Sequence, residues 1–569
     1  MKQSLFCLAF LFSGLFVSAQ APTYTDGFSF GGPKDDAFTD VFYHKGQLYY
    51  IGTFSDSMDA NPGTAATDTF WLRSKGKTDI FISVISENGS FVRAIALGGT
   101  GDDFPHAICV DTGGNVYISG RINSSGIDLD PGTGTFLVQG NGLFYYDGYM
   151  ARYDKNLAFS RAIAIPLRNG STSESVQLHD MALGENGDLF VTGSVSGSAD
   201  FDPGSSTLQL GSGSSGSSSI VLARYNPQLE LRWAYATGSY GSNSGQAIAI
   251  DSRNQDILLT GMFSAQTVDM NFSSDSFFLH RSGYAQDLYL ARYSANAQFQ
   301  WAFRLGNVND DISTGIAVNA AGRIGISGAY SRTVDFNPAP NDSFKLTAVS
   351  DRDAFVALYR PDGRFIAAAD TGTISIDQAY GLAIDRKGYA YYTGQLSGSM
   401  FTAKIDSSGK TVWMMRQQGG VNYIHGRRVF LDSEENLILT STFTSSFTPV
   451  NGGSFNAIPN AGMSDIFVLR YRQAGSSSAT TEMPGSVHRL VLAPNPLSGP
   501  ARLLFNDLQR HTGQWQVFGL DGRVHLSGKA YNAGPELHLD LSTLPQGVYL
   551  LEWQEAGISP VRIRFQKMP

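Results

Sequence analysis

The sequence predicts an all-β protein made of a seven-bladed β-propeller followed by a small β-sandwich. Three observations predict it. A hairpin-like segment recurs along the chain, each copy is followed by two more strand-like runs, and the recurrence ends before residue 474. Four strands per unit at a nearly fixed period are typical of a propeller or another repeat array.

The repeated hairpin is clearest at 107–132, which reads AICVDTGGNVYISGRINSSGIDLDPG. Two β-rich runs flank a turn that contains Gly113, Gly114 and Asn115, which is a hairpin signal. A glycine closes the second strand in most copies, and the steps between these positions are 68, 73, 68, 67, 66 and 47 residues. The closing positions are Gly52, Gly120, Gly193, Gly261, Gly328, Gly394 and Ser441.

Each unit continues with a third strand, such as 286–294 (QDLYLARYS), and a fourth strand, such as the one around Trp301. The alternation of apolar and polar residues in the third strand suits a sheet with one buried face. Runs of small residues suit strands that are buried on both sides, and we expect them to line the propeller axis, where only small side chains fit. These runs are Ala247–Ile250, Gly315–Val318 and Leu382–Ile384.

The two ends of the array predict a closed ring. The seventh unit reaches its third strand at Asp465–Tyr471 and has no fourth strand of its own. Near the N-terminus, Phe28–Phe30 and the glycines after it look like the end of a fourth strand, as at Ala96–Gly99. Pairing of these two segments would remove exposed sheet edges, which otherwise invite aggregation. We therefore predict a propeller over residues 20–473 that is closed by its N-terminal strand.

The repeats resemble the bacterial β-propeller repeats often labelled SBBP, whose units carry a VYVTG strand, a DFDPG-like loop and a D-x-FVAKY strand. The resemblance covers roughly residues 27–473. The sixth and seventh units depart from the pattern because they lack the Asp-Pro-Gly loop. The resemblance implies architecture and export, and it does not imply a substrate.

Composition excludes some classes of partner. The formal net charge of −9 argues against a nucleic-acid ligand or an anionic membrane surface. The chain has 63 glycines and only 16% charged residues, which suits a turn-dense extracellular β protein.

Residues 1–19 are interpreted as a secretory signal peptide. Lys2 precedes the apolar run Leu5–Val17, and small residues lie before the expected cut at Ala19. The apolar run is too short to span a membrane, and a buried N-terminal strand is the alternative. Removal of the signal leaves Cys109 as the only cysteine, so we predict a buried core thiol and no internal disulfide.

A second module follows a polar linker at 474–485 and extends over 486–569. It contains Pro494-Asn495-Pro496, then Asp521-Gly522-Arg523 in a hairpin, then 541–551 (LSTLPQGVYLL), and a basic terminal strand. This order resembles the type A C-terminal sorting domain of the type IX secretion system of the Bacteroidetes, although Asp521 directly precedes Gly522 here. The resemblance implies the type IX machinery as a partner and delivery through the periplasm to the cell surface or the medium. An ordinary adhesive sandwich domain is the alternative.

The strongest candidate for a ligand site is an acidic loop that recurs in five units. In an extended segment, residues i and i+2 point the same way, so both oxygen-bearing side chains of a D-x-[DN] motif reach one side. Calcium prefers such oxygens, but fixing of the turn by side-chain bonds to the backbone is the competing interpretation. The candidate ligands are Asp59, Asn61, Asp128, Asp130, Asp200, Asp202, Asp269, Asn271, Asp335 and Asn337.

Three Asp pairs lie between the fourth strand of one unit and the first strand of the next, at 35–36, 102–103 and 310–311. Adjacent carboxylates in a strand point to opposite faces, which makes them a poor acid/base pair. We therefore expect them to hold turns.

The sequence contains no motif of a known catalytic or nucleotide-binding class, and its nine histidines are scattered. We therefore predict an exported, non-enzymatic binding module that contacts a protein or a glycan through its loops, where function is usually located. The alternative is an exported hydrolase or lyase with a site at the channel mouth, built from single residues of several blades. Its candidate residues are Asp103, His106, Asp311 and His425.

Overall fold

The computed structural model describes residues 21–63, 68–122, 126–140, 146–168, 174–202, 204, 206–212, 216–417, 425–451, 457–473, 490–493, 501–505, 511–519, 523–533, 536–555 and 561–567. The predicted signal peptide and linker lie outside these residues. The chain divides into two compact units, Met1–Ser476 and Ser477–Pro569. The described residues form strands and no helix, so none of them lies in a helix able to cross a membrane.

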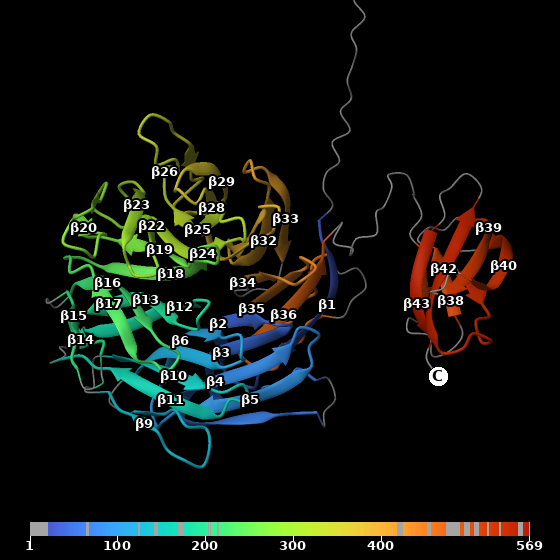
Figure 1. Ribbon diagram of the computed structural model, residues 1–569, viewed down its shortest axis with the longest axis horizontal. Coiled ribbons are helices and arrows are strands. Elements are labelled where there is room, and N and C mark those ends of the chain that lie inside the picture. The colour runs from blue at the N-terminus through green and yellow to red at the C-terminus, as the bar shows by residue number, and fades with distance from the viewer. Residues whose placement is uncertain are drawn as a thin grey trace, which may run out of the picture. The chain divides into compact units, whose positions relative to one another are not determined.

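The described residues of the first unit form seven four-stranded antiparallel sheets, which follow one another around a central axis (Figure 1). The first strands of the sheets are β2 (Asp36–His44), β6 (Phe104–Val110), β12 (Ser175–Leu183), β18 (Asn243–Asp251), β24 (Ile312–Val318), β30 (Gln378–Ile384) and β34 (His425–Leu431). The second strands are β3 (Gln47–Asp59), β7 (Val116–Ile122), β13 (Leu189–Ser196), β19 (Asp256–Phe263), β25 (Ile324–Tyr330), β31 (Ala390–Leu396) and β35 (Leu437–Phe443).

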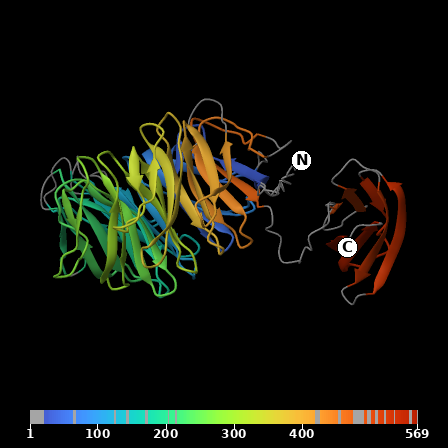
Figure 2. The same ribbon diagram turned by 90° about the horizontal axis from the view of Figure 1, so that it is seen from above.

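The third and fourth strands complete each sheet toward its outer edge, and Figure 2 shows the same unit turned by 90°. The third strands are β4 (Trp71–Ser86), β10 (Asp147–Tyr153), β16 (Ser218–Tyr225), β22 (Asp287–Tyr293), β28 (Asp353–Tyr359), β32 (Ser399–Ile405) and β36 (Asp465–Arg472). The fourth strands are β5 (Phe91–Leu97), β11 (Phe159–Ile165), β17 (Leu231–Ala236), β23 (Phe299–Leu305), β29 (Phe365–Thr371), β33 (Thr411–Gln417) and, in the last sheet, β1 (Thr23–Phe30). This strand order confirms the predicted all-β propeller architecture.

The N-terminal strand closes the ring as predicted. β1 pairs antiparallel with β36, with Phe28 opposite Val468 and Ser29 opposite Phe467 (Figure 1). Asp26 forms an ion pair with Arg470 across the same two strands. The first and last parts of the propeller are therefore joined by a strand ladder.

Four sheets carry a two-stranded ribbon between their second and third strands. The ribbons are β8 (Ile127–Asp128) with β9 (Leu137–Val138), β14 (Ser198–Asp200) with β15 (Gln209–Gly211), β20 (Thr267–Asp269) with β21 (Phe278–His280), and β26 (Thr333–Asp335) with β27 (Lys345–Thr347). In the sixth sheet a tight turn through Ser397 and Gly398, both at positive φ, replaces the ribbon.

The hydrophobic core lies between neighbouring sheets. Phe190 and Leu222 of the third sheet pack with Ile257 and Tyr289 of the fourth, and similar clusters fill the other interfaces. Cys109 is fully buried and unpaired, as predicted, and burial raises the pKa of its thiol. Buried aromatic and branched side chains thus hold the sheets face to face.

The second unit contains two antiparallel sheets. One has the order β37 (Leu490–Ala493), β38 (Ala501–Phe505), β41 (Glu536–Leu539), and the other β40 (Val524–Ala533), β39 (His511–Gly519), β42 (Gly547–Glu555), β43 (Val561–Lys567). Leu503 of the first sheet and Leu551, Trp553 and Phe565 of the second belong to one buried core.

Candidate functional site

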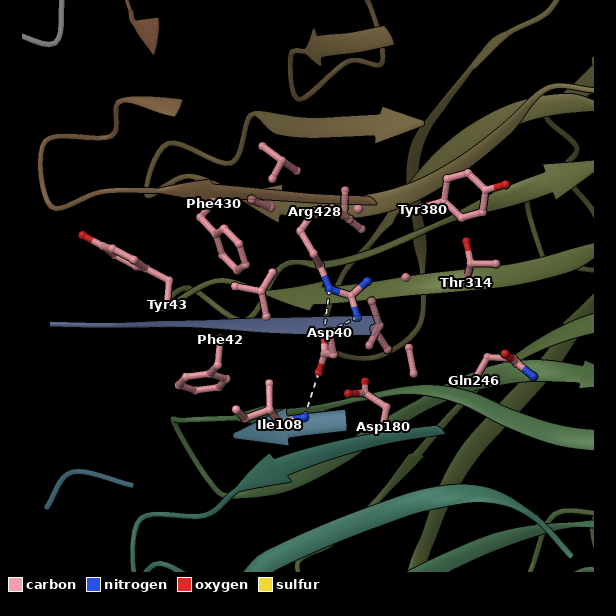
Figure 3. Close-up of a pocket in the computed structure, with 18 of the residues that line it drawn as sticks. Asp40, Phe42, Tyr43, Ile108, Asp180, Gln246, Thr314, Tyr380, Arg428 and Phe430 are labelled. Atoms are coloured by element: carbon pink, nitrogen blue, oxygen red, sulfur yellow. Dashed lines mark hydrogen bonds and ion pairs between the residues drawn. The ribbon is translucent and has the colours of Figure 1, made fainter. Parts of the chain in front are cut away.

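The first strands of the seven sheets surround a cavity of about 320 Å³ on the propeller axis (Figure 3). Ala247, Gly315 and Leu382 line it, which confirms that the small-residue runs face the axis. Every one of the seven strands contributes to the wall. One lining residue from each is Asp40, Ile108, Asp180, Ala247, Gly315, Gly381 and Arg428.

A β-bulge at the same place in each first strand shapes this wall. The extra residue of a bulge bends the strand and changes the direction of nearby side chains. Gln246, Thr314 and Tyr380 occupy bulge positions and line the cavity. The register shifts fall at Phe38/Asp40, Pro105/Ala107, Gln177/Asp180, Gly245/Ala247, Ser313/Gly315, Ala379/Gly381 and Gly426/Arg428.

The cavity has a polar part and an apolar part. In Figure 3, Gln246, Thr314 and Tyr380 lie on one side, and Phe42 and Phe430 on the other. Pockets that combine an apolar wall with a few convergent polar groups are the usual form of a ligand site.

Asp40 joins the first and last sheets, which are neighbours in the closed ring. Its Oδ1 accepts hydrogen bonds from Arg428 Nη2 (2.7 Å) and Nε (3.1 Å), and its Oδ2 accepts one from the backbone N–H of Ile108 (3.0 Å) (Figure 3). The carboxylate thus has a cationic partner and a backbone donor on the next sheet.

Asp180 has the same place in the third sheet but lacks the cation. Its Oδ2 accepts the backbone N–H of Ile248 on the next sheet (2.9 Å), and its Oδ1 accepts that of Met181 (2.9 Å). Among the described residues, no ion pair is formed by Asp180. Burial, followed by the nearby charge of Asp40, raises the pKa of Asp180 to about 7, against the effect of Arg428.

A pair of histidines lies at the bulges of the second and third sheets. The rings of His106 and His179 are 5.6 Å apart, edge to face. Burial lowers the pKa of His106 to about 3 and that of His179 to about 4, so both imidazoles are neutral at pH 7. Arg121 is near both, and its guanidinium lies 4.4 Å from the centre of the Tyr146 ring.

Two members of the alternative catalytic set predicted from the sequence lie away from the axial cavity. Asp103 and Asp311 are buried between sheets, where they accept the backbone N–H groups of Gly99 and Asn307 (2.8 Å each), and neither lines the cavity. Asp36, the corresponding residue of the 35–36 pair, accepts the backbone N–H of Gly32 in the same way. The side chain of His425 lies outside the described part of the chain.

The acidic loops are held by hydrogen bonds from their own backbone. The first Asp of each loop accepts, through Oδ1, the N–H two residues on and a second N–H after the loop, as Asp128 does with Asp130 (3.1 Å) and Phe136 (2.9 Å). The same pairs of bonds occur at Asp59, Asp200, Asp269 and Asp335. These are the bonds of a fixed turn.

The second oxygen-bearing residue of the loop also bonds to the backbone. Asn61, Asp130, Asn271 and Asn337 each accept the N–H two residues further on, at 2.9 to 3.1 Å. The described residues contain no group of three or more His, Cys, Asp or Glu side chains able to hold a metal ion. Calcium binding at these loops, including Asp202, stays a prediction.

Comparisons with known proteins agree with a repeat protein. No family model matches the chain. An uncharacterized WD repeat-containing protein of Acanthamoeba polyphaga mimivirus is 19% identical in an alignment of 480 positions that covers 70% of this chain; the chain spans only 34% of that relative. The strand order and this likeness identify the chain as a β-propeller-like repeat protein.

Solved structures with related folds are distant. The polysaccharide lyase Uly1 is 10% identical with a TM-score of 0.38, over 79% of this chain and 99% of that one. Drosophila Plexin A, in complex with Semaphorin 1b, is 10% identical with a TM-score of 0.37, over 80% of this chain and 88% of that one. At these scores, neither neighbour bears on function.

Proposed function

We propose that the propeller is a non-enzymatic binding module that takes a polar group of a protein or glycan ligand into its axial cavity. The observation that supports this is the cavity itself, where Asp180, Gln246, Thr314 and Tyr380 converge opposite an apolar wall. Sugar hydroxyls and polar side chains of peptides are groups that such a set can hydrogen-bond.

The bonds of the two channel carboxylates favour binding over acid/base catalysis. Asp40 is tied to Arg428 and Ile108, and both oxygens of Asp180 already accept backbone N–H groups. A general base must be within reach of a substrate proton and is usually oriented by another side chain. Asp40 and Asp180 instead have fixed backbone partners on neighbouring strands.

An exported hydrolase or lyase is the second candidate, because the pKa of Asp180 is raised to about 7 beside a cavity. Perturbed titratable groups in a cavity are a common sign of catalysis. This candidate would use Asp180, and it needs turnover of a substrate to support it.

Binding is tested by screening the full chain against polysaccharide and peptide collections. We expect saturable binding without turnover, weakened about tenfold or more by Gln246→Ala or Tyr380→Ala because each removes a polar group from the cavity wall. Tyr284→Ala is the matched control, since that side chain is 95% exposed and should leave affinity unchanged. Turnover that is lost in Asp180→Asn or His106→Ala would instead establish the enzyme.

We further propose that residues 486–569 act as the address for export through the type IX machinery. The support is the ordered match of 494–496, 521–523 and 541–551 to the sorting-domain pattern, at the C-terminal end of this sequence. The propeller would then act at the cell surface or in the medium.

A chain without residues 486–569 is expected to accumulate in the periplasm, whereas the full chain reaches the outside. The measurement is fractionation of cells that possess the type IX system. Replacement of 474–485 by a Gly/Ser segment of equal length is the control and should not change export. Surface delivery of the truncated chain would contradict the proposal.

A further inference from the structure

The axial cavity is lined by two carboxylates and one cationic side chain. In the described part of the chain, its charged lining residues are Asp40, Asp180 and Arg428. Arg428 is paired with Asp40, whereas Asp180 forms no ion pair with a described residue. With both carboxylates ionised, the lining therefore has one more negative charge than positive charges. Such a carboxylate needs a cation supplied by a ligand, or a proton.

Asp40 and Asp180 have the same place in their sheets, so their surroundings can be compared directly. Each accepts through Oδ2 the backbone N–H of an isoleucine on the next sheet, at 3.0 and 2.9 Å. Oδ1 of Asp40 accepts two hydrogen bonds from the guanidinium of Arg428, whereas Oδ1 of Asp180 accepts the backbone N–H of Met181 (2.9 Å). A carboxylate can accept about four hydrogen bonds, so Asp180 can still accept bonds from a group in the cavity.

The polar side of the cavity presents hydrogen-bond acceptors. The Nε2 group of Gln246 donates to Ser244 Oγ (3.0 Å), and this leaves the amide oxygen as an acceptor. The hydroxyl of Thr314 donates to the carbonyl of Ala379 (2.6 Å), and its oxygen can still accept. With Asp180, these residues come from three successive sheets. The set favours a ligand that donates hydrogen bonds, and the charge of Asp180 favours a cationic one.

The apolar side of the cavity suits the hydrocarbon part of such a ligand. Phe42, Tyr43 and Phe430 line it, and in Figure 3 Asp180 lies between these rings and Gln246. Aromatic rings attract cations and also pack against the methylene groups of a lysine side chain. The volume of about 320 Å³ is near the lower end for small-molecule sites. The cavity therefore admits one extended side chain rather than an oligosaccharide.

We propose that the axial cavity binds a primary alkylammonium group, as on the lysine side chain of a protein ligand, with the ammonium at Asp180 and the methylene groups against Phe42 and Phe430. The proposal rests on the binding function proposed above and names the group that the cavity takes. An ammonium carries three N–H donors on one compact charge, which matches acceptors that come from separate strands. A guanidinium prefers a bidentate carboxylate, but each oxygen of Asp180 already accepts a backbone N–H.

Binding to the full chain is measured by calorimetry with four probes. Three are peptides with blocked ends and glycines around one central residue, which is lysine, Nε-acetyllysine or norleucine. The fourth is 1,5-diaminopentane, which carries the same ammonium group without a peptide. The lysine peptide is expected to bind about tenfold or more tightly than the two neutral peptides, because it alone carries the charge. Weaker binding of the diamine would assign a protein ligand, and tighter binding would assign a free amine to the same ammonium site.

Two variants test the count of charges in the cavity. Asp180→Asn keeps the shape of the side chain and removes its charge, so the preference for the lysine peptide should disappear. Asp40→Asn leaves Asp180 as the one carboxylate of the lining that can balance Arg428, so it should also reduce the preference. Asp102→Asn is the matched control: the same change at a partly exposed carboxylate away from the cavity should leave binding unchanged. If Asp180→Asn does not fold, Asp40→Asn gives the readout.

The possible results separate this proposal from the binding function on which it rests. Equal binding of the three peptides, weakened by Gln246→Ala, would overturn the ammonium site and keep the cavity as a binding site. A preference for lysine that persists in Asp180→Asn would also overturn it, because the ammonium would then lie elsewhere. If neither these probes nor any polysaccharide or peptide of the collections binds, both proposals fail.

Discussion

A chain that begins at residue 33 is expected to lose on the order of 6 kcal/mol or more of unfolding free energy relative to one that begins at residue 20, or to fail to fold. The truncation removes β1, including Tyr24 and Phe30, which are 4% exposed, and loss of a large core aromatic costs about 3–5 kcal/mol. It also leaves the edge of β36 without its partner. We expect the truncated chain to associate through this edge.

Urea denaturation and light scattering measure the two effects. Asp26→Asn is the control: it removes the partly exposed ion pair with Arg470 but keeps the strand, so it should cost no more than about 1 kcal/mol. If the truncated chain unfolds at the same urea concentration as the longer one and stays monomeric, β1 does not contribute to the stability of the ring.

Much of the fold could be predicted because the signals are local and repeated. The glycines that close the second strands, such as Gly120 and Gly261, lie opposite backbone that a side chain would strike. The ARY-type third strands end in a tyrosine, such as Tyr153 or Tyr293, whose buried hydroxyl donates to a carbonyl of the acidic loop (2.8 Å). The strand, turn and loop recognised in one repeat therefore predict the same features in the other repeats.

The axial site could not be predicted in the same way, because it is assembled from residues far apart in the sequence. Asp40 and Arg428 are 388 residues apart, and neither belongs to a motif. The bulges that direct side chains to the axis have no clear sequence signal. One signal in the sequence could have indicated these two carboxylates. Asp40 and Asp180 have the same place in their repeats, and each accepts the backbone N–H of a residue 68 positions later.

The Asp pairs show why residue type alone did not reveal their surroundings. Asp36, Asp103 and Asp311 hold turns, as the sequence suggested, but each also faces a second aspartate from the preceding sheet. That partner, such as Asp79, belongs to the third strand of the sheet. The electrostatic cost of burying these Asp pairs therefore arises from the packing of neighbouring sheets.

These buried carboxylates lead to an expected pH dependence of stability in the absence of added metal. The unfolding free energy should fall as the pH rises above about 4, and by about 3 kcal/mol between about pH 6.5 and about pH 8. Burial raises the pKa of Asp36 to about 8, and that of Asp103 and Asp311 to about 7, from an ordinary value near 3.8. The folded state then holds protons that the unfolded state has already released, so rising pH removes the stabilisation.

The histidines oppose this trend only at lower pH. Burial lowers the pKa of His106 and His179 below 6.5, so the unfolded state binds protons more readily there, and the contribution of these two groups to stability falls as the pH drops below about 6.5. Because two histidines offset only part of the effect of three carboxylates, we expect stability to fall from about pH 5 to about pH 8, less steeply below about pH 6.5, as measured by urea denaturation in chelator across the pH range. Asp103→Asn should flatten the alkaline side, because the amide does not titrate. Stability that instead rises between pH 6.5 and 8 would mean that Asp36, Asp103 and Asp311 are ionised and compensated in the folded protein.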